Sequence, residues 1–226
     1  MTEQEWRYNE FAAPDGAQAV VNFLNEPLRQ GEGEASVTLR NDGSAALVWL
    51  EPGSLGESTA QTWQVSEFPA PGGEQALVAF LNEPLRQGHG EARATLRNDG
   101  TAGLVWLEPG SLGESTAQTW QPREFAAPDG TQAAATFLNE PLRQGAGEAS
   151  LTPRGNGTAG LVWLEPGSLG EGTGQEWLVE QFQGPDGGKA AVDFLNEAPR
   201  QGPGEASVFV RNDGSAVVLY LAPGSA

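Results

Sequence analysis

Hydrophobic and polar positions change their spacing twice within the first 56 residues. Trp6–Phe11 is short and rich in large side chains, which predicts a β-strand. Val20, Phe23, Leu24 and Leu28 then follow one another at i, i+3, i+4 and i+8. That spacing places them on one side of an amphipathic helix.

The ends of this helix also have signals. The turn sequence Ala-Pro-Asp-Gly precedes it, so we expect Asp15 or a neighbour to cap the first free N–H groups. Pro27 removes a hydrogen-bond donor and disfavours helical geometry at Glu26. The regular helix should therefore end near Asn25.

After the helix the spacing becomes two. Between Ala35 and Arg40 apolar and polar residues alternate, which predicts a strand with one buried and one polar face. Asn41–Gly43 is a strong hairpin-turn signal, because glycine tolerates a positive φ. Ala46–Leu50 is apolar at every position and predicts a third strand buried on both faces. The unit is therefore a βαββ motif.

The same unit occurs four times with a period of 57 residues and no gap. The nonapeptide FLNEPLRQG at Phe23–Gly31 recurs at Phe80–Gly88 and Phe137–Gly145, and it persists as FLNEAPRQG at Phe194–Gly202. An internal repeat of this kind overrides any domain count based on length. We expect an α+β protein of four tandem repeats, at residues 1–56, 57–113, 114–170 and 171–226.

Two prolines in the third copy indicate the order of the strands. Pro122 interrupts the first strand of that copy and Pro153 the second, whereas the third strand carries no proline in any copy. Proline cannot donate to a sheet ladder and is largely confined to edges. The expected order is first strand, third strand, second strand. A degraded repeat is the alternative explanation.

A single repeat should not be stable alone. One helix covers only one face of a three-stranded sheet, and a unit of about 50 residues buries a modest share of its surface. We therefore expect the sheets to pack on each other with the helices outside. Both two pairs and a closed ring satisfy this requirement, and polar connectors such as Pro52–Gln61 are long enough for either.

Charge and composition exclude several classes of protein. Twelve basic against thirty acidic residues give a net charge of −18, which would repel nucleic acids and anionic membranes. There is no cysteine, hence no disulfide framework. The amino-terminal residues do not resemble a signal peptide, and no apolar run reaches transmembrane length. A cytoplasmic location is the expectation.

Catalytic chemistry has little support in the sequence. The single histidine, His89, corresponds to Glu32, Ala146 and Pro203 in the other copies, so no Ser/His/Asp set can be assembled. The glycine-rich GEGEA and GAGEA sequences precede a strand rather than a helix, unlike phosphate loops. The Asp-Gly turns lack the oxygen density of a calcium loop. We expect no catalytic residue, no metal site and no cofactor.

The polar residues of the nonapeptide are the candidate binding site. They are an asparagine, a glutamate, an arginine and a glutamine in each copy: Asn25, Glu26, Arg29, Gln30, Asn82, Glu83, Arg86, Gln87, Asn139, Glu140, Arg143, Gln144, Asn196, Glu197, Arg200 and Gln201. One interpretation is a helix C-terminus, with an asparagine suited to the cap and an arginine facing the negative end of the dipole. Another is a recognition loop for carboxylates, sugars or peptide backbone. A third is docking between repeats.

The sequence therefore predicts a non-enzymatic protein for multivalent binding or assembly through this repeated loop. The partner would be a protein or a small polar ligand, and self-association into a homo-oligomer remains an open alternative. Two other functions stay in competition. The acidic charge could mimic DNA and inhibit a basic nucleic-acid-binding protein, or the repeats could bind carbohydrate. The tryptophans, however, lie in predicted strands and are better explained as core residues.

Overall fold

The computed structural model describes residues 5–26, 35–51, 62–83, 92–108, 119–140, 149–165, 176–197 and 206–222. In the first repeat, β1 spans Glu5–Phe11, α1 Gly16–Leu24, β2 Ala35–Leu39 and β3 Ala45–Glu51. In the second, β4 spans Thr62–Phe68, α2 Gly73–Leu81, β5 Ala92–Leu96 and β6 Ala102–Glu108. In the third, β7 spans Thr119–Phe125, α3 Gly130–Leu138, β8 Ala149–Pro153 and β9 Ala159–Glu165. In the fourth, β10 spans Glu176–Phe182, α4 Gly187–Asn196, β11 Ala206–Val210 and β12 Ala216–Ala222.

Each repeat forms one three-stranded sheet in the order predicted from the prolines. The first repeat has the order β1-β3-β2, and the other three repeat it. Both outer strands run antiparallel to the central one. Pro122 and Pro153 lie in the edge strands β7 and β8, opposite Val162 and Ala159 of the central strand β9. The helix likewise ends as predicted, with Asn25 as its C-cap residue.

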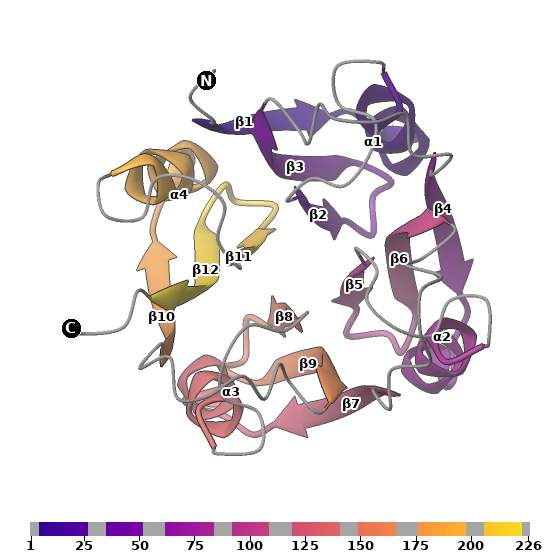
Figure 1. Ribbon diagram of the computed structural model, residues 1–226, viewed down its shortest axis with the longest axis vertical. Helices are drawn as coiled ribbons and strands as arrows, with labels where there is room; N and C mark the ends of the chain where they lie inside the picture. The colour runs from indigo at the N-terminus through magenta and orange to yellow at the C-terminus, as the bar shows by residue number, and fades with distance from the viewer. Residues whose placement is uncertain are drawn as a thin grey trace.

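The four sheets are arranged as a ring around a central axis (Figure 1). The strands β2, β5, β8 and β11 lie nearest the axis, and the helices lie at the outer rim. Neighbouring repeats meet through these inner strands, and the fourth repeat contacts the first in the same way, β11 against β2 and α4 against β1. Of the two arrangements that the sequence left open, these contacts are those of a closed ring.

Each hydrophobic core is shared by two repeats. Val20, Leu24 and Trp49 of the first repeat pack with Trp63 and Val105 of the second. The other three cores are built in the same way, and the last one combines the fourth repeat with the first. Each helix therefore covers its own sheet and also contacts the outer strand of the next, as α1 does with β4. The main contacts between neighbouring sheets involve the inner strands near the axis, and the helices lie further out (Figure 1).

The turn before each helix docks on the hairpin between the second and third strands. The Gly16 N–H donates to the Gly43 carbonyl at 2.9 Å. A Cβ on Gly16 would lie 2.6 Å from the backbone nitrogen of Ala45, so only glycine fits at this approach. The predicted cap is wrong, since the Asp15 side chain makes no capping hydrogen bond. This contact with the hairpin, rather than a side-chain cap, fixes the start of the helix.

The second strand of each repeat is more buried than its alternating sequence predicts. All five positions of β2 are buried, including Ser36 at 2% exposure and Thr38 at 1%. The expectation of a half-buried strand is therefore wrong. The polar face of this strand is turned toward the axis, where the inner strands of the neighbouring repeats cover it. In contrast, the all-apolar third strand is buried as predicted, from Ala45 to Trp49.

Candidate functional site

The asparagine of the nonapeptide joins each repeat to the next. The Asn25 Nδ2 donates to the Trp63 carbonyl at 2.9 Å, and the Trp63 N–H donates to Asn25 Oδ1 at 2.7 Å. The side-chain amide thus pairs with backbone as a neighbouring strand would. We call this pair of bonds the asparagine clamp. Its other copies are Asn82–Trp120, Asn139–Trp177 and Asn196–Trp6, with lengths from 2.7 to 3.0 Å.

The clamp explains why an asparagine stands at the end of the helix in every copy. As the C-cap residue, Asn25 stands where α1 meets the outer strand of the next repeat. The amide supplies both a donor and an acceptor, which the free N–H and C=O of Trp63 require. The asparagine therefore matches the third interpretation of the nonapeptide, docking between repeats.

The remaining candidate residues are placed only in part. The glutamates Glu26, Glu83, Glu140 and Glu197 come directly after the four clamps and are exposed. The arginines and glutamines of the motif lie outside the described residues: Arg29, Gln30, Arg86, Gln87, Arg143, Gln144, Arg200 and Gln201. The structure thus brings the four asparagines to the four seams, one to each, and leaves the glutamates beside them at the surface.

Side-chain hydroxyls join the inner strands around the axis. Thr95 Oγ1 accepts a hydrogen bond from the Leu39 N–H at 3.3 Å and donates to the Val37 carbonyl at 3.5 Å. These backbone groups belong to β2, which is the edge strand of its sheet. They lie on the side of β2 that has no neighbouring strand to pair with. Thr152 and Thr38 accept equivalent bonds from the N–H groups of Leu96 and Val210. The hydroxyls thus satisfy buried edge groups that would otherwise destabilise the fold.

The seam between the third and fourth repeats lacks this hydrogen bond, because both the acceptor and the donor residue are replaced. Phe209 stands where the other repeats have threonine, so it has no hydroxyl to accept a bond. Its partner position in the third repeat is Pro153, which has no N–H to donate. The two substitutions therefore compensate each other, and no backbone N–H at this position is left unsatisfied.

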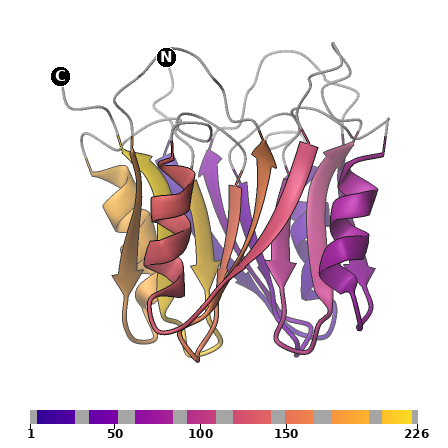
Figure 2. The same ribbon diagram turned by 90° about the horizontal axis from the view of Figure 1, so that it is seen from below.

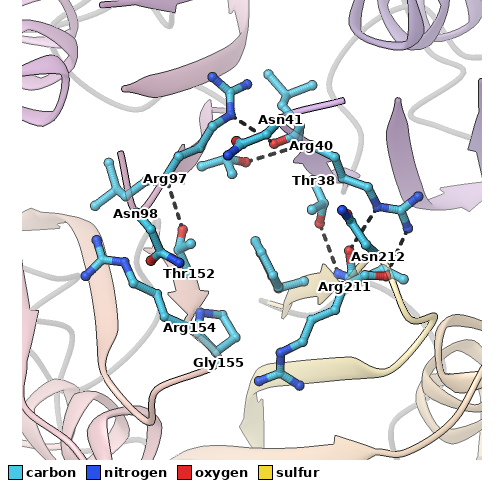
Figure 3. Close-up of a pocket in the computed structure, with 16 residues that line it drawn as sticks. Thr38, Arg40, Asn41, Arg97, Asn98, Thr152, Arg154, Gly155, Arg211 and Asn212 are labelled. Atoms are coloured by element: carbon cyan, nitrogen blue, oxygen red, sulfur yellow. Dashed lines mark hydrogen bonds between the residues drawn. The ribbon is translucent and has the colours of Figure 1, made fainter. Parts of the chain in front are cut away.

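A ring of four arginines surrounds an axial pocket of about 220 Å³. Arg40, Arg97, Arg154 and Arg211 are the residues that precede the four hairpin turns. Figure 3 shows their side chains pointing away from the axis and along the seams. Arg97 Nε donates to the Leu39 carbonyl at 3.3 Å, and Arg40 Nε to the Val210 carbonyl at 3.4 Å. Arg40 and Arg97 thus serve as further links between repeats, whereas the Nε atoms of Arg154 and Arg211 have no hydrogen-bond partner among the described residues.

Three of these arginines pair with a glutamate of their own repeat. Arg97 forms a bidentate pair with Glu67, with contacts of 2.5 and 2.9 Å, and Arg40 contacts Glu10 at 2.9 Å. Arg154 pairs with Glu124 in the same manner. The hydrogen bond from Arg40 holds the pKa of Glu10 below its ordinary value, with a further contribution from the Tyr8 hydroxyl. Burial and the same glutamate raise the pKa of Tyr8.

The described ranges hold no group of three or more His, Cys, Asp or Glu side chains that could hold a metal ion. No helix in the same ranges is long and apolar enough to cross a membrane. The described tryptophans are at most 8% exposed, which confirms them as core residues. Sequence reasoning missed Ser36, Thr38 and Arg40 as contact residues. The sequence feature that could have identified them is a polar side chain at every second position of this strand, repeated in most copies. It was not recognised because the sequence did not show which strand lies beside this one.

Comparisons with models of known protein families, with curated proteins and with solved structures found no match.

Proposed function

We propose that the ring is a non-enzymatic binding protein that engages its partner through four copies of one polar segment. The observation that supports this is the position of the helix ends. The four helices end at the end of the ring opposite the hairpin turns (Figure 2). An asparagine clamp holds each helix end in place, so the exposed glutamates that follow stand at equivalent positions around the axis.

Four equivalent helix ends at one end of the ring favour multivalent binding by the segments that follow them. Once one site is engaged, the others bind at a high effective concentration, so avidity can exceed single-site affinity by a factor of about 10²–10⁴. The segment supplies arginine and glutamine side chains, which suit carboxylate groups and peptide backbone. A protein partner that presents such groups at several places is the class that fits. The same four-fold arrangement would also suit a scaffold that binds several copies of one small partner.

The test removes the arginines in steps. Variants with one, two and four of Arg29, Arg86, Arg143 and Arg200 changed to alanine would be compared with the wild type for capture of a partner isolated from the native host. The same four positions changed to lysine serve as the control, because lysine keeps the charge but loses the planar fork. We expect capture to fall more steeply than the number of sites lost, with the lysine variant intermediate.

The melting temperature distinguishes binding from folding in this experiment. An arginine on a solvent-exposed segment is expected to contribute at most about 1 kcal/mol to stability. The quadruple alanine variant should therefore melt close to the wild type while it loses its partner. If capture is unchanged in that variant, the segment does not bind. If the variant does not fold, the arginines are part of the seams and the proposal fails.

The two competing functions have less support. A DNA mimic requires carboxylates gathered on one face, which the four exposed glutamates at the helix ends provide only in part, whereas Glu10, Glu67 and Glu124 are each paired with an arginine. Carbohydrate binding would need accessible aromatic faces, and the described tryptophans are buried in the shared cores.

A further inference from the structure

The fourth repeat breaks the pattern of arginine–glutamate pairs. Glu10, Glu67 and Glu124 each stand 30 residues before their arginine, and the corresponding residue before Arg211 is Gln181. Arg211 keeps the hairpin contact, since its Nη1 donates to Ser215 Oγ at 3.3 Å, as Arg97 does to Thr101. What it lacks, among the described residues, is a carboxylate partner in its own repeat.

The guanidinium of Arg211 is left with unused donors. Its Nη2 has no hydrogen-bond partner among the bonds of the described residues, and its Nε, like that of Arg154, is buried without one. Asp213 is the charged group next to it in the hairpin, but that carboxylate already accepts bonds from the Ser215 N–H and Oγ at 2.9 and 2.7 Å. A buried donor without a partner destabilises the folded state, and more so in a charged group. Arg154 Nε is equally unpartnered although its Nη1 and Nη2 donate to Glu124, so the donors that a carboxylate would satisfy at Arg211 are those of its two Nη atoms.

The fourth repeat also differs from the second and third at a residue beside the arginine–glutamate pair. Gly103 and Gly160 lie beside the pairs in the second and third repeats, and a Cβ on Gly103 would come 3.1 Å from Arg97 Nη2 and 3.3 Å from Glu67 Oε1. The fourth repeat has Val217 at this position, and it is buried. A larger apolar side chain thus stands where the second and third repeats have glycine.

The repeats that keep the arginine–glutamate pair show which chemical group binds at this position. Glu67 meets Arg97 with both carboxylate oxygens, from a side chain that is 52% exposed, whereas that of Arg97 is only 12% exposed. The carboxylate therefore comes from the solvent side onto a largely buried guanidinium. From this pattern we infer that Arg211 binds a carboxylate supplied by another molecule, at the hairpin end of the seam between the third and fourth repeats.

This site is separate from the described part of the repeated polar segment, since the helix ends lie at the end of the ring opposite the hairpin turns (Figure 2). It is also single, because three of the four equivalent positions are filled by the protein's own glutamates. A partner held by the four segments and a carboxylate held by Arg211 could therefore bind at the same time. Two sources offer the group, a free carboxylic acid and an acidic side chain of a polypeptide.

The test follows the Nε–H signals of Arg211 and Arg97 by NMR on the full chain. Acetate is added at constant ionic strength. We expect a saturable shift at Arg211 several times larger than that at Arg97, whose site is occupied by Glu67. A capped tripeptide with a central glutamate, and the same peptide with glutamine, distinguish the sources. Tighter binding of the glutamyl peptide than of acetate points to a polypeptide, and equal binding to a free acid.

Two variants exchange the open and the filled site. The Gln181→Glu, Val217→Ala variant reproduces the first repeat, which has Glu10 and Ala46, and it should abolish the response of Arg211. Glu67→Gln should create a response at Arg97. The inference is overturned if Arg211 responds no more than Arg97 in the wild type, or if Glu67→Gln gains nothing. The second variant decides the question if the first does not fold.

Discussion

The rim and the axis of the ring join the same four repeats in different ways. At the rim, each seam has the same asparagine clamp on a tryptophan backbone. At the axis, the contacts vary from seam to seam. Thr95 and Thr152 accept backbone bonds in two seams, Arg93 replaces a serine in one, and Phe209 faces Pro153 in another.

The difference reflects what each contact must provide. At the rim a single side chain has to satisfy one N–H and one C=O at once, and a primary amide does this with its two ends. At the axis the requirement is only that the edge of each inner strand be covered. A hydroxyl, a guanidinium or an aromatic ring can meet it, provided the partner residue changes to match. Assembly of the ring therefore requires an asparagine at this position in every repeat, whereas the residue types at the axis can vary.

Removal of the rim contacts and the axial contacts together should have the largest effect on stability. Residues 1–56 alone lose the fourth repeat that covers Trp6 and the second repeat that completes the core around Trp49. The remaining core must offset a conformational entropy of about 1–2 kcal/mol per residue. We expect no cooperative thermal transition by circular dichroism for this fragment as a monomer, and a better one for residues 1–113, which keep one seam. Cooperative melting of monomeric 1–56 would contradict the shared cores.

Loss of one clamp should be the next largest effect. Asn139→Leu leaves the Trp177 N–H and C=O without partners, and each such group costs about 1–3 kcal/mol when it is buried. We expect a loss of about 2–4 kcal/mol in the free energy of unfolding measured with urea. Asn139→Asp keeps the acceptor and should lose less. A loss within the error of measurement for the leucine variant would show that the clamp is not what holds the rim.

An axial hydroxyl should matter less than a clamp. Thr152→Val keeps the shape of the side chain and removes the acceptor of the Leu96 N–H, at a cost of about 1 kcal/mol. The matched position in the next repeat is Phe209, where Phe209→Thr alone should gain nothing, because Pro153 has no N–H. With Pro153→Leu added, a favourable coupling of about 0.5–1.5 kcal/mol should appear in a double-mutant cycle. Additive effects would mean that the two residues are independent.

The arginine–glutamate pairs should show the smallest effect, through pH. The pKa of Glu10 is lowered chiefly by the hydrogen bond from Arg40, so the pair contributes stability above the ordinary glutamate pKa. That contribution is lost as the pH falls through the lowered value. The Glu10 side chain is half exposed, so we expect about 0.5 kcal/mol or less. Urea unfolding of Glu10→Gln at neutral and acidic pH would measure it, and the difference from wild type should shrink in acid.

The architecture within each repeat could be predicted from the sequence because its signals are local. The change from spacing of three and four to spacing of two located the helix and strands. Pro122 and Pro153 gave the strand order, which the ladders confirm. The end of α1 at Leu24 followed from Pro27.

The contacts between repeats could not be predicted, because their partners lie far away in the sequence. Asn25 reads as an ordinary helix cap, and nothing near it shows that its amide pairs with Trp63, 38 residues later. Ser36 and Thr38 read as a solvent-facing side of a strand, and only closure around the axis buries them. A polar side chain that returns in repeat after repeat is ambiguous by itself, since binding and assembly both preserve it.

The seam between the fourth and first repeats has a consequence for the connectivity of the chain. No peptide bond joins Ala222 to Glu5, yet Asn196 holds Trp6 with the same two bonds as in the seams whose repeats are consecutive. The backbone path is therefore not what selects a repeat's neighbours. A circular permutant opened at any of the connectors should find the same native arrangement. Two separately expressed halves should complement each other, and any adjacent pair of repeats can be the first to dock as the protein folds.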